Sequence, residues 1–280
     1  MAGMSLPLSQ YDDIVRLALA EDIGAAGDIT SLATIPADRL ASARMIVKTP
    51  GVICGLDVAA TVFMAVDPLL NVTLLAADGD SVVAGQGVLD VTGPARSILT
   101  AERVALNFVQ QLSGVASQTR RLVDIVAGTN AQIIDTRKTT PGMRALEKYA
   151  VRCGGGGNHR MGLYDQILIK DNHIAVAGGV TAALAAVQGR AERTEIEVDT
   201  IDQLREALDA GARFVLLDNM PPAQLAQAVA INAGRAVLEA SGGITPSTVR
   251  AVAETGVDLI SVGWITHSAP ALDIGLDITL

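Results

Sequence analysis

The chain has 280 residues and a mass of 28.9 kDa, enough for one large domain or two modest ones. Half of its residues are hydrophobic, but no uninterrupted apolar stretch approaches the roughly 18 residues of a membrane-spanning helix, so we expect a soluble protein without a membrane partner. A net charge of −9 and 2% aromatic residues argue against nucleic-acid binding, which relies on basic surfaces and stacking side chains. Two cysteines make no disulfide framework and no leader pattern opens the sequence, so a reducing cytoplasm is the expected location.

The first hundred residues predict a small α+β unit. Strand-like segments, separated by Gly, Pro and Asp turn signals, lie at residues 42–48, 72–76 and 87–92. A helix is expected near residues 56–66, and a second helix begins near Thr100 and is expected to end at Gly114. We therefore predict an N-terminal α+β domain over residues 1–113 and a second domain over residues 114–280.

The second domain alternates short apolar runs with helical stretches. The runs, rich in Ile, Leu and Val, lie at residues 132–135, 166–170, 195–199, 214–218, 236–241 and 258–263. The clearest helical stretches between them, each followed by a glycine stop, lie at residues 201–210, 222–233 and 246–255. Strands that alternate with helices predict a parallel α/β sheet, either open or closed into a barrel.

Acidic residues on one strand favour the barrel. Glu195, Glu197 and Asp199 share one face of their strand, so that face must meet a polar interior or a ligand rather than a layer of helices. In such barrels the chemistry gathers where the strands end. The predicted strand ends supply Asp135, Lys170, Asp199, Asp218, Ser241 and Gly263.

Positive charge is concentrated in one part of this acidic chain. Between residues 137 and 170 there are seven Lys or Arg and two acids, an excess of five positive charges: Arg137, Lys138, Arg144, Lys148, Arg152, Arg160 and Lys170 against Glu147 and Asp165. The loop at 135–144 combines cations and hydroxyls before a helix, and the loop at 152–160 places four glycines before Asn158, His159 and Arg160. Both patterns suit a small anion better than a solvated loop.

The remaining polar residues at strand ends have two interpretations each. Lys170 needs an anionic partner if it is buried, or else it extends to the rim of the barrel. Glu197 and Asp218 end neighbouring strands and suit Mg²⁺, held directly or through water, although structural salt bridges are as plausible. The segments 241–245 and 262–264 carry glycines and small hydroxyls that suit a phosphate cup or ordinary turns.

Taken together, these motifs resemble the quinolinate phosphoribosyltransferase family, also called decarboxylating nicotinate-nucleotide pyrophosphorylases. The resemblance rests on the order and spacing of Asp135-Thr-Arg-Lys-Thr-Thr-Pro-Gly142, Lys148-Tyr-Ala-Val151, Gly154-Gly-Gly-Gly-Asn-His-Arg160, Lys170-Asp-Asn-His173, Glu195-Ile-Glu-Val198, Leu217-Asp-Asn219, Ser241-Gly-Gly243 and Thr266-His-Ser268. It extends to Glu21-Asp-Ile-Gly24 and Gly27-Asp-Ile-Thr-Ser31 and so covers essentially the whole chain.

The resemblance implies a fold and a reaction. The fold would be an N-terminal open sandwich and a C-terminal six- or seven-stranded α/β barrel, paired as a homodimer. The reaction would join quinolinate to phosphoribosyl pyrophosphate with Mg²⁺ and no organic cofactor, giving nicotinate mononucleotide, pyrophosphate and CO₂ in NAD biosynthesis.

The resemblance also implies roles for individual residues. Arg137, His159, Arg160 and Lys170 would hold the quinolinate carboxylates, joined by Arg103 of the partner subunit. Lys138, Glu197 and Asp218 would be catalytic and face the ribose pyrophosphate, and the two acids would address the metal. The remaining substrate contacts, chiefly to the 5′-phosphate, would come from Thr136, Ser241, Gly242, Gly243, Val262, Gly263, Trp264 and His267.

The sequence departs from the family pattern at Trp264, where a small residue is usual beside the phosphate cup, and Cys153 is interpreted as a small buried apolar residue. Two alternatives were weighed. A molybdenum-operon type of phosphoribosyltransferase with another acceptor is disfavoured by the complete Asn158-His-Arg160 and Lys170-Asp-Asn-His173 sets. A non-catalytic anion-binding module is disfavoured by the acid pair Glu197 and Asp218, because carboxylates do not help to bind phosphate alone.

Overall fold

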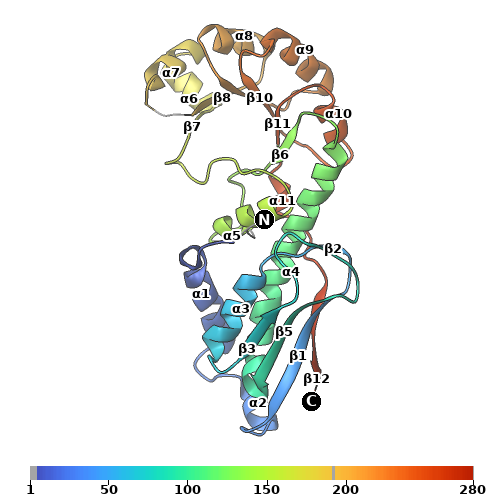
Figure 1. The fold of residues 1–280 in the computed structure, drawn as a ribbon. Coiled ribbons are helices and arrows are strands. Elements are labelled where there is room, and N and C mark those ends of the chain that lie inside the picture. Colours follow the sequence, from blue (N-terminus) through green and yellow to red (C-terminus); the bar gives the residue numbers. More distant parts are fainter. Residues whose placement is uncertain (1–4, 191–192, 280) are drawn as a thin grey trace. The chain divides into compact units, whose positions relative to one another are not determined.

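The computed structural model describes residues 5–190 and 193–279, which form two compact units (Figure 1). The first unit combines three stretches of the chain, residues 1–120, 139–155 and 265–280, and the second combines residues 121–138 and 156–264. Each unit is therefore built from segments that lie far apart in the sequence.

The first unit contains an antiparallel sheet with strand order β12-β1-β5-β3. Its strands are β1 (Leu40–Val47), β3 (Asn71–Leu74), β5 (Gly87–Pro94) and β12 (Ile274–Thr279), and a separate short pair joins β2 (Gly51–Val52) to β4 (Ser81–Val82). In β1 the residues alternate between exposed and buried, because successive side chains of a strand point to opposite faces. One face of this sheet consequently packs on the core and the other meets solvent.

The helices of the first unit begin at recognisable signals. The helical elements are η1 (Leu8–Gln10), α1 (Asp12–Ile23), α2 (Ile29–Thr34), α3 (Leu56–Val66), α4 (Ala95–Val126, of which residues 95–120 belong to this unit), α5 (Arg144–Cys153) and α11 (Trp264–His267, continuing from the second unit). Asp28 caps α2 by accepting the Ser31 amide at 3.0 Å. Asp78 accepts the amides of Gly55 and Leu56, at 2.9 and 3.0 Å, where α3 begins. Among the described residues, every helix is too short or too polar to cross a lipid bilayer.

Helix α4 corrects one prediction. The helix was expected to end at Gly114, but it continues to Val126. Gly114 lies against the backbone of Pro270, so that a Cβ built on it would come within 3.0 Å of the Pro270 carbonyl group, closer than real Cβ atoms approach. The glycine therefore permits close packing inside the helix and does not terminate it.

The second unit contains the predicted parallel sheet, with strand order β6-β11-β10-β9-β8-β7. The strands are β6 (Gln132–Ile134), β7 (Ile167–Ile169), β8 (Thr194–Val198), β9 (Phe214–Asp218), β10 (Val237–Ser241) and β11 (Leu259–Ser261). All six predicted runs contain a strand, and the mixed α/β class is confirmed. Backbone pairing runs from β6 to β7 without joining these two edge strands within the described part of the chain, so the barrel is open there.

Helices cover the outer side of these strands (Figure 1). They are α6 (Asp171–Ala177), α7 (Val180–Val187), α8 (Ile201–Asp209), α9 (Pro222–Asn232) and α10 (Val249–Ala253). A capping box between Thr200 and Gln203 begins α8, and Pro222 occupies the first turn of α9, where its missing N–H costs nothing. These local signals explain why α8 and α9 begin where expected, whereas α10 begins at Val249, after the predicted start at residue 246.

Both cysteines belong to the first unit, where they are free and buried. Burial raises the pKa of the Cys54 thiol, so that this group stays protonated. The interpretation of Cys153 as a small buried residue is confirmed. The division of the chain at residue 113 stays a prediction. Helix α4 runs through that position, and β12, near the end of the chain, pairs with β1.

The packing of Gly114 generates a testable prediction. Gly114→Ala should lower the free energy of unfolding by about 2 kcal/mol, because the added methyl group overpacks against the Pro270 backbone. The loss should occur although alanine favours helices over glycine by about 1 kcal/mol. Denaturant unfolding of both proteins measures the difference. The control is Asn107→Ala on the exposed side of the same helix, and a G114A protein as stable as this control would contradict the prediction.

Candidate active site

A cavity of about 450 Å³ opens at the carboxyl ends of the parallel strands of the second unit. Most of the predicted site residues line it: Thr136, Arg137, Lys138, His159, Arg160, Lys170, Glu197, Asp218, Ser241, Gly242 and Gly243. These residues come from the ends of β6, β7, β8, β9 and β10 and from the loop before β7, which explains why residues more than a hundred positions apart in the sequence meet in one place. The volume suits a small molecule.

The remaining predicted residues do not line this cavity. Val262 is 2% exposed, and Gly263 lies so close to Lys138 that a Cβ built on it would be 2.9 Å from the Lys138 Cδ. The Trp264 ring is half-buried, and its Nε1 donates a hydrogen bond to the Ile244 carbonyl oxygen at 2.9 Å. Arg103 and His267 belong to the first unit.

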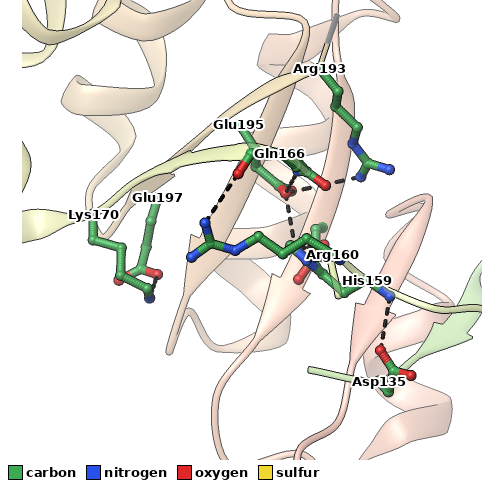
Figure 2. A network of polar contacts seen from close by, with 9 residues as sticks. Asp135, His159, Arg160, Gln166, Lys170, Arg193, Glu195 and Glu197 are labelled. Atoms are coloured by element: carbon green, nitrogen blue, oxygen red, sulfur yellow. Dashed lines mark hydrogen bonds and ion pairs between the residues drawn. The ribbon is translucent and has the colours of Figure 1, made fainter. Parts of the chain in front are cut away.

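The cluster of positive charge divides between the two units. Arg137, Lys138, Arg160 and Lys170 line the cavity, whereas Arg144, Lys148 and Arg152 lie on α5 of the first unit. Burial, together with the charge of Arg137, lowers the pKa of Arg160. Lys170 forms an ion pair with Glu197, and so it has the anionic partner that the sequence called for (Figure 2). The cavity therefore has the cationic lining that a site for a small anion requires.

A buried polar network holds His159 and Arg160 in place (Figure 2). Asp135 accepts the His159 amide at 2.9 Å and the Asn158 side chain at 2.6 Å. The Arg160 amide donates to His159 Nδ1 at 2.7 Å, so the ring proton lies on Nε2. That nitrogen is 3.0 Å from a carboxylate oxygen of Glu195, which also accepts Gln166 Nε2 at 2.8 Å.

A second buried acid lies beside Glu195. Glu239, which is 1% exposed, has a carboxylate oxygen 3.5 Å from His159 Nε2. Burial and the neighbouring Glu195 charge raise the pKa of Glu239 well above its ordinary value. Burial, the largest single effect, would also raise the pKa of Glu195, but the combined effects of His159, Arg193 and Glu239 outweigh it and the pKa is lowered. Glu239 is consequently the neutral member of the pair and Glu195 the ionised one.

Glycines form the loop after β10. Gly242 and Gly243 have φ angles of +102° and +60°, which side chains disfavour. A Cβ on Gly242 would also approach within 3.0 Å of the Asn219 side-chain oxygen. Asn219 itself has a φ of +55°; its amide donates to the Ser241 carbonyl oxygen at 2.9 Å and its Nδ2 to Asp218 at 2.7 Å. This loop offers backbone amides at the cavity wall, as a phosphate site requires.

Two predicted residues are described within the first unit alone. Arg103 lies on the exposed side of α4 and makes no hydrogen bond or ion pair with any described residue. His267 Nδ1 is 2.6 Å from the Ser268 hydroxyl group, and the histidine lines a cavity of about 480 Å³ with Glu21, Asp22 and Glu147. The roles that the sequence analysis expects for Arg103 and His267 stay predictions.

Three polar residues at the cavity have no role in the assignment made from sequence, although Asn219 belongs to one of its motifs. Glu239, Asn219 and Ser261 all line it. Glu239 and Ser241 share one face of β10, while Leu238 and Ala240 take the other. This is the alternation that identified the acids of β8, so the same test applied to β10 would have found Glu239.

Comparison with known proteins gives consistent matches along the chain. Family models match residues 28–113 as "Quinolinate phosphoribosyl transferase, N-terminal domain" and residues 115–277 as its C-terminal domain. The nicotinate-nucleotide pyrophosphorylase (carboxylating) of Mycobacterium leprae is 47% identical over 273 residues, which cover 95% of this chain and 96% of that protein. Quinolinate phosphoribosyltransferase (decarboxylating) 2b, mitochondrial, of Nicotiana tabacum is 43% identical, covering 97% and 83%. The structure of nicotinate-nucleotide pyrophosphorylase from Francisella tularensis has a TM-score of 0.94 at 42% identity and covers 98% of both chains.

The buried acid pair predicts how stability depends on pH. Because its pKa is raised, folded Glu239 keeps a proton that the unfolded chain releases above pH ~4.3, so its contribution to stability falls as pH rises from there. Glu239→Gln removes this loss. The stability of E239Q relative to the parent should therefore increase from pH 4 to pH 8, by up to about 1.4 kcal/mol for each pH unit.

Glu195→Gln is the matched control, with the opposite sign. The lowered pKa of Glu195 contributes stability that is fully present above its unfolded pKa of ~4.3 and is lost as pH falls through the folded pKa, so the stability of E195Q relative to the parent should fall as pH rises toward ~4.3 and stay nearly constant above it. Thermal unfolding of the three proteins from pH ~3 to pH ~8 measures both differences. A stability difference between E239Q and the parent that does not change with pH would contradict the assignment of the neutral acid.

Proposed function

The chain belongs to the quinolinate phosphoribosyltransferase family, and we propose that it transfers the phosphoribosyl group of phosphoribosyl pyrophosphate to quinolinate. The products are nicotinate mononucleotide, pyrophosphate and CO₂. The observation that carries the proposal is the cavity that combines four cationic side chains, three acids including Glu197 and Asp218, and a glycine loop. A pyridine with two carboxylates and a sugar carrying phosphate and pyrophosphate would use all three features.

The quinolinate carboxylates bind to Arg137, His159, Arg160 and Lys170 in this proposal. Arg160 supplies a planar guanidinium group suited to a carboxylate, and its NH1 donates to the Gln166 carbonyl oxygen at 3.1 Å, which fixes its direction. Lys170 is exposed over 44% of its side chain and is paired with Glu197, so an entering carboxylate can share its charge. The Nε2 proton of His159 faces Glu195, so this proton reaches a substrate carboxylate only if the contact with Glu195 is replaced by a contact with the substrate.

Lys138, Glu197 and Asp218 face the ribose pyrophosphate. Lys138 stabilises the negative charge that develops on the leaving pyrophosphate, and a carboxylate from Glu197 or Asp218 stabilises the positive charge that develops on the ribose. The carboxylate oxygens of both acids at the cavity fit Mg²⁺, directly or through water, since this ion prefers oxygen ligands. When bound, Mg²⁺ would supply further charge neutralisation at the pyrophosphate.

Decarboxylation follows from the chemistry of the ribosylated ring. The nitrogen is then cationic, so it stabilises the negative charge left at the adjacent carbon when CO₂ departs, and a proton takes the place of CO₂. The protein needs to orient the ring and exclude water, and this step calls for no organic cofactor. Leu168 and Leu216 line the same cavity and supply apolar surface for the ring.

The sugar 5′-phosphate binds to Ser241, Gly242 and Gly243, with Thr136, Val262, Gly263, Trp264 and His267 contributing contacts or support. Backbone amides and a hydroxyl group hold a phosphate without adding steric bulk. The protein acts as a homodimer, and Arg103 of each subunit completes the quinolinate site of the other. The absence of a partner for exposed Arg103 among the described residues supports this role. Two free cysteines suit a cytoplasmic location.

The deciding experiment supplies quinolinate, phosphoribosyl pyrophosphate and Mg²⁺ and follows nicotinate mononucleotide and CO₂. Equal amounts of both products are expected. Asp218→Asn should lower kcat by roughly 10²-fold or more, because it removes charge that stabilises the transition state. The control is Asp209→Asn on the outer helix α8, which should leave the rates unchanged. Turnover of nicotinate with none of quinolinate would overturn the proposal in favour of the molybdenum-operon type of transferase.

The shared site predicts a selective effect of Arg103→Ala. This variant should raise the KM or Kd for quinolinate by about tenfold or more, as loss of a charged hydrogen bond of about 1.5–3 kcal/mol implies, and should change phosphoribosyl pyrophosphate binding much less. Kinetics with each substrate varied in turn measure the two effects. Arg121→Ala, another arginine of α4, is the control. Equal losses for both substrates would contradict the assigned role of Arg103.

A further inference from the structure

Trp264, the single tryptophan of the chain, lies at the end of the β11 loop and is bonded to another loop. Its ring is half-buried, and Nε1 donates to the carbonyl oxygen of Ile244 at 2.9 Å. Ile244 is 7% exposed and directly follows the glycine loop Ser241–Gly242–Gly243. The indole thus joins the loop after β11 to the loop after β10 through one side chain.

The glycine loop needs such a connection. Gly242 and Gly243 have no side chains through which packing could fix their backbone, and both have positive φ angles. At its beginning the loop is held by the Asn219 amide, which donates to the Ser241 carbonyl oxygen at 2.9 Å. At its end it is held by Trp264 at Ile244. Asn219 itself has a φ of +55°, a backbone conformation that residues other than glycine adopt rarely.

The residue before Trp264 packs against a residue of the cavity wall. Gly263, the residue before Trp264, packs so closely on Lys138 that a Cβ there would be 2.9 Å from the Lys138 Cδ. Trp264 itself does not line the cavity, so its effect on a ligand there would pass through the residues that it holds. The position of Trp264 therefore affects the glycine loop through the hydrogen bond to Ile244. It also affects the Lys138 side chain through the packing of Gly263.

We propose that Trp264 is a positioning residue, which holds the glycine loop Ser241–Gly243 ready for the 5′-phosphate of the phosphoribosyl substrate. This inference rests on the proposed function. A loop that is already ordered loses less conformational entropy when it binds phosphate. The resulting gain in affinity is specific to the ligand that this loop contacts. The carboxylate-binding side chains lie outside the glycine loop, so the hydrogen bond from the indole to Ile244 does not hold them directly.

The first test is Trp264→Phe, which keeps an aromatic ring and removes the N–H donor. The KM for phosphoribosyl pyrophosphate should rise about fivefold, equivalent to about 1 kcal/mol, while the KM for quinolinate stays unchanged. The control is Phe214→Leu, which removes an aromatic ring at the opposite end of β9 from Asp218. It should change neither KM. An unchanged KM for phosphoribosyl pyrophosphate in W264F, or equal rises for both substrates, would overturn the proposal.

The second test measures binding without turnover and so separates this inference from the proposed reaction. Calorimetric titration with ribose 5-phosphate should give a Kd about fivefold weaker for W264F than for the parent and for F214L. If W264F binds ribose 5-phosphate about fivefold more weakly than the parent, but the parent does not convert quinolinate, the proposed reaction is wrong and the positioning role of Trp264 is still supported. If the parent does not bind ribose 5-phosphate, or all three proteins bind it equally, the anchor is refuted.

Discussion

The buried carboxylate of Glu195 is the interaction on which the interior of the second unit depends. It lies 3.0 Å from His159 Nε2 and accepts a hydrogen bond from Gln166 Nε2 at 2.8 Å, with 1% of its surface exposed. An ionised carboxylate in such a place is tolerated only with donors of this kind, and a second charge beside it would be costly. Protonation of Glu239 removes that second charge, and the pair together determines how the His159 ring is oriented.

The orientation of His159 determines the position of its neighbour. Because His159 Nδ1 accepts the Arg160 amide at 2.7 Å, the arginine begins from a fixed backbone position, and its guanidinium group is then held by the Gln166 carbonyl oxygen. Gln166 in turn donates to Glu195. The buried network and the cation at the cavity are thus one connected structure, and a change in the interior would alter anion binding without touching the ligand.

The strands and many of the site residues could be predicted from local sequence. Asp218 and Ser241 end strands whose apolar runs are evident, and Glu195 and Glu197 follow the period of two that a polar interior imposes. Other features gave no local signal. Gly114 looks like a helix stop in sequence, but its role comes from the backbone of Pro270, more than 150 residues further on. The pairing of β12 with β1 joins the two ends of the chain and likewise depends on distant residues.

By itself, the sequence determined the class of fold, the parallel strands, the family and the excess of positive charge near Arg137 to Lys170, because local residue patterns and the order of motifs along the chain are enough to identify them. The tertiary structure alone decided which of these cations meet. Arg137, Lys138, Arg160 and Lys170 converge at one cavity, while Arg144, Lys148 and Arg152 lie on a helix of the other unit. The physical reason is that convergence depends on which strands pair, and that pairing is set by burial of side chains distant in sequence.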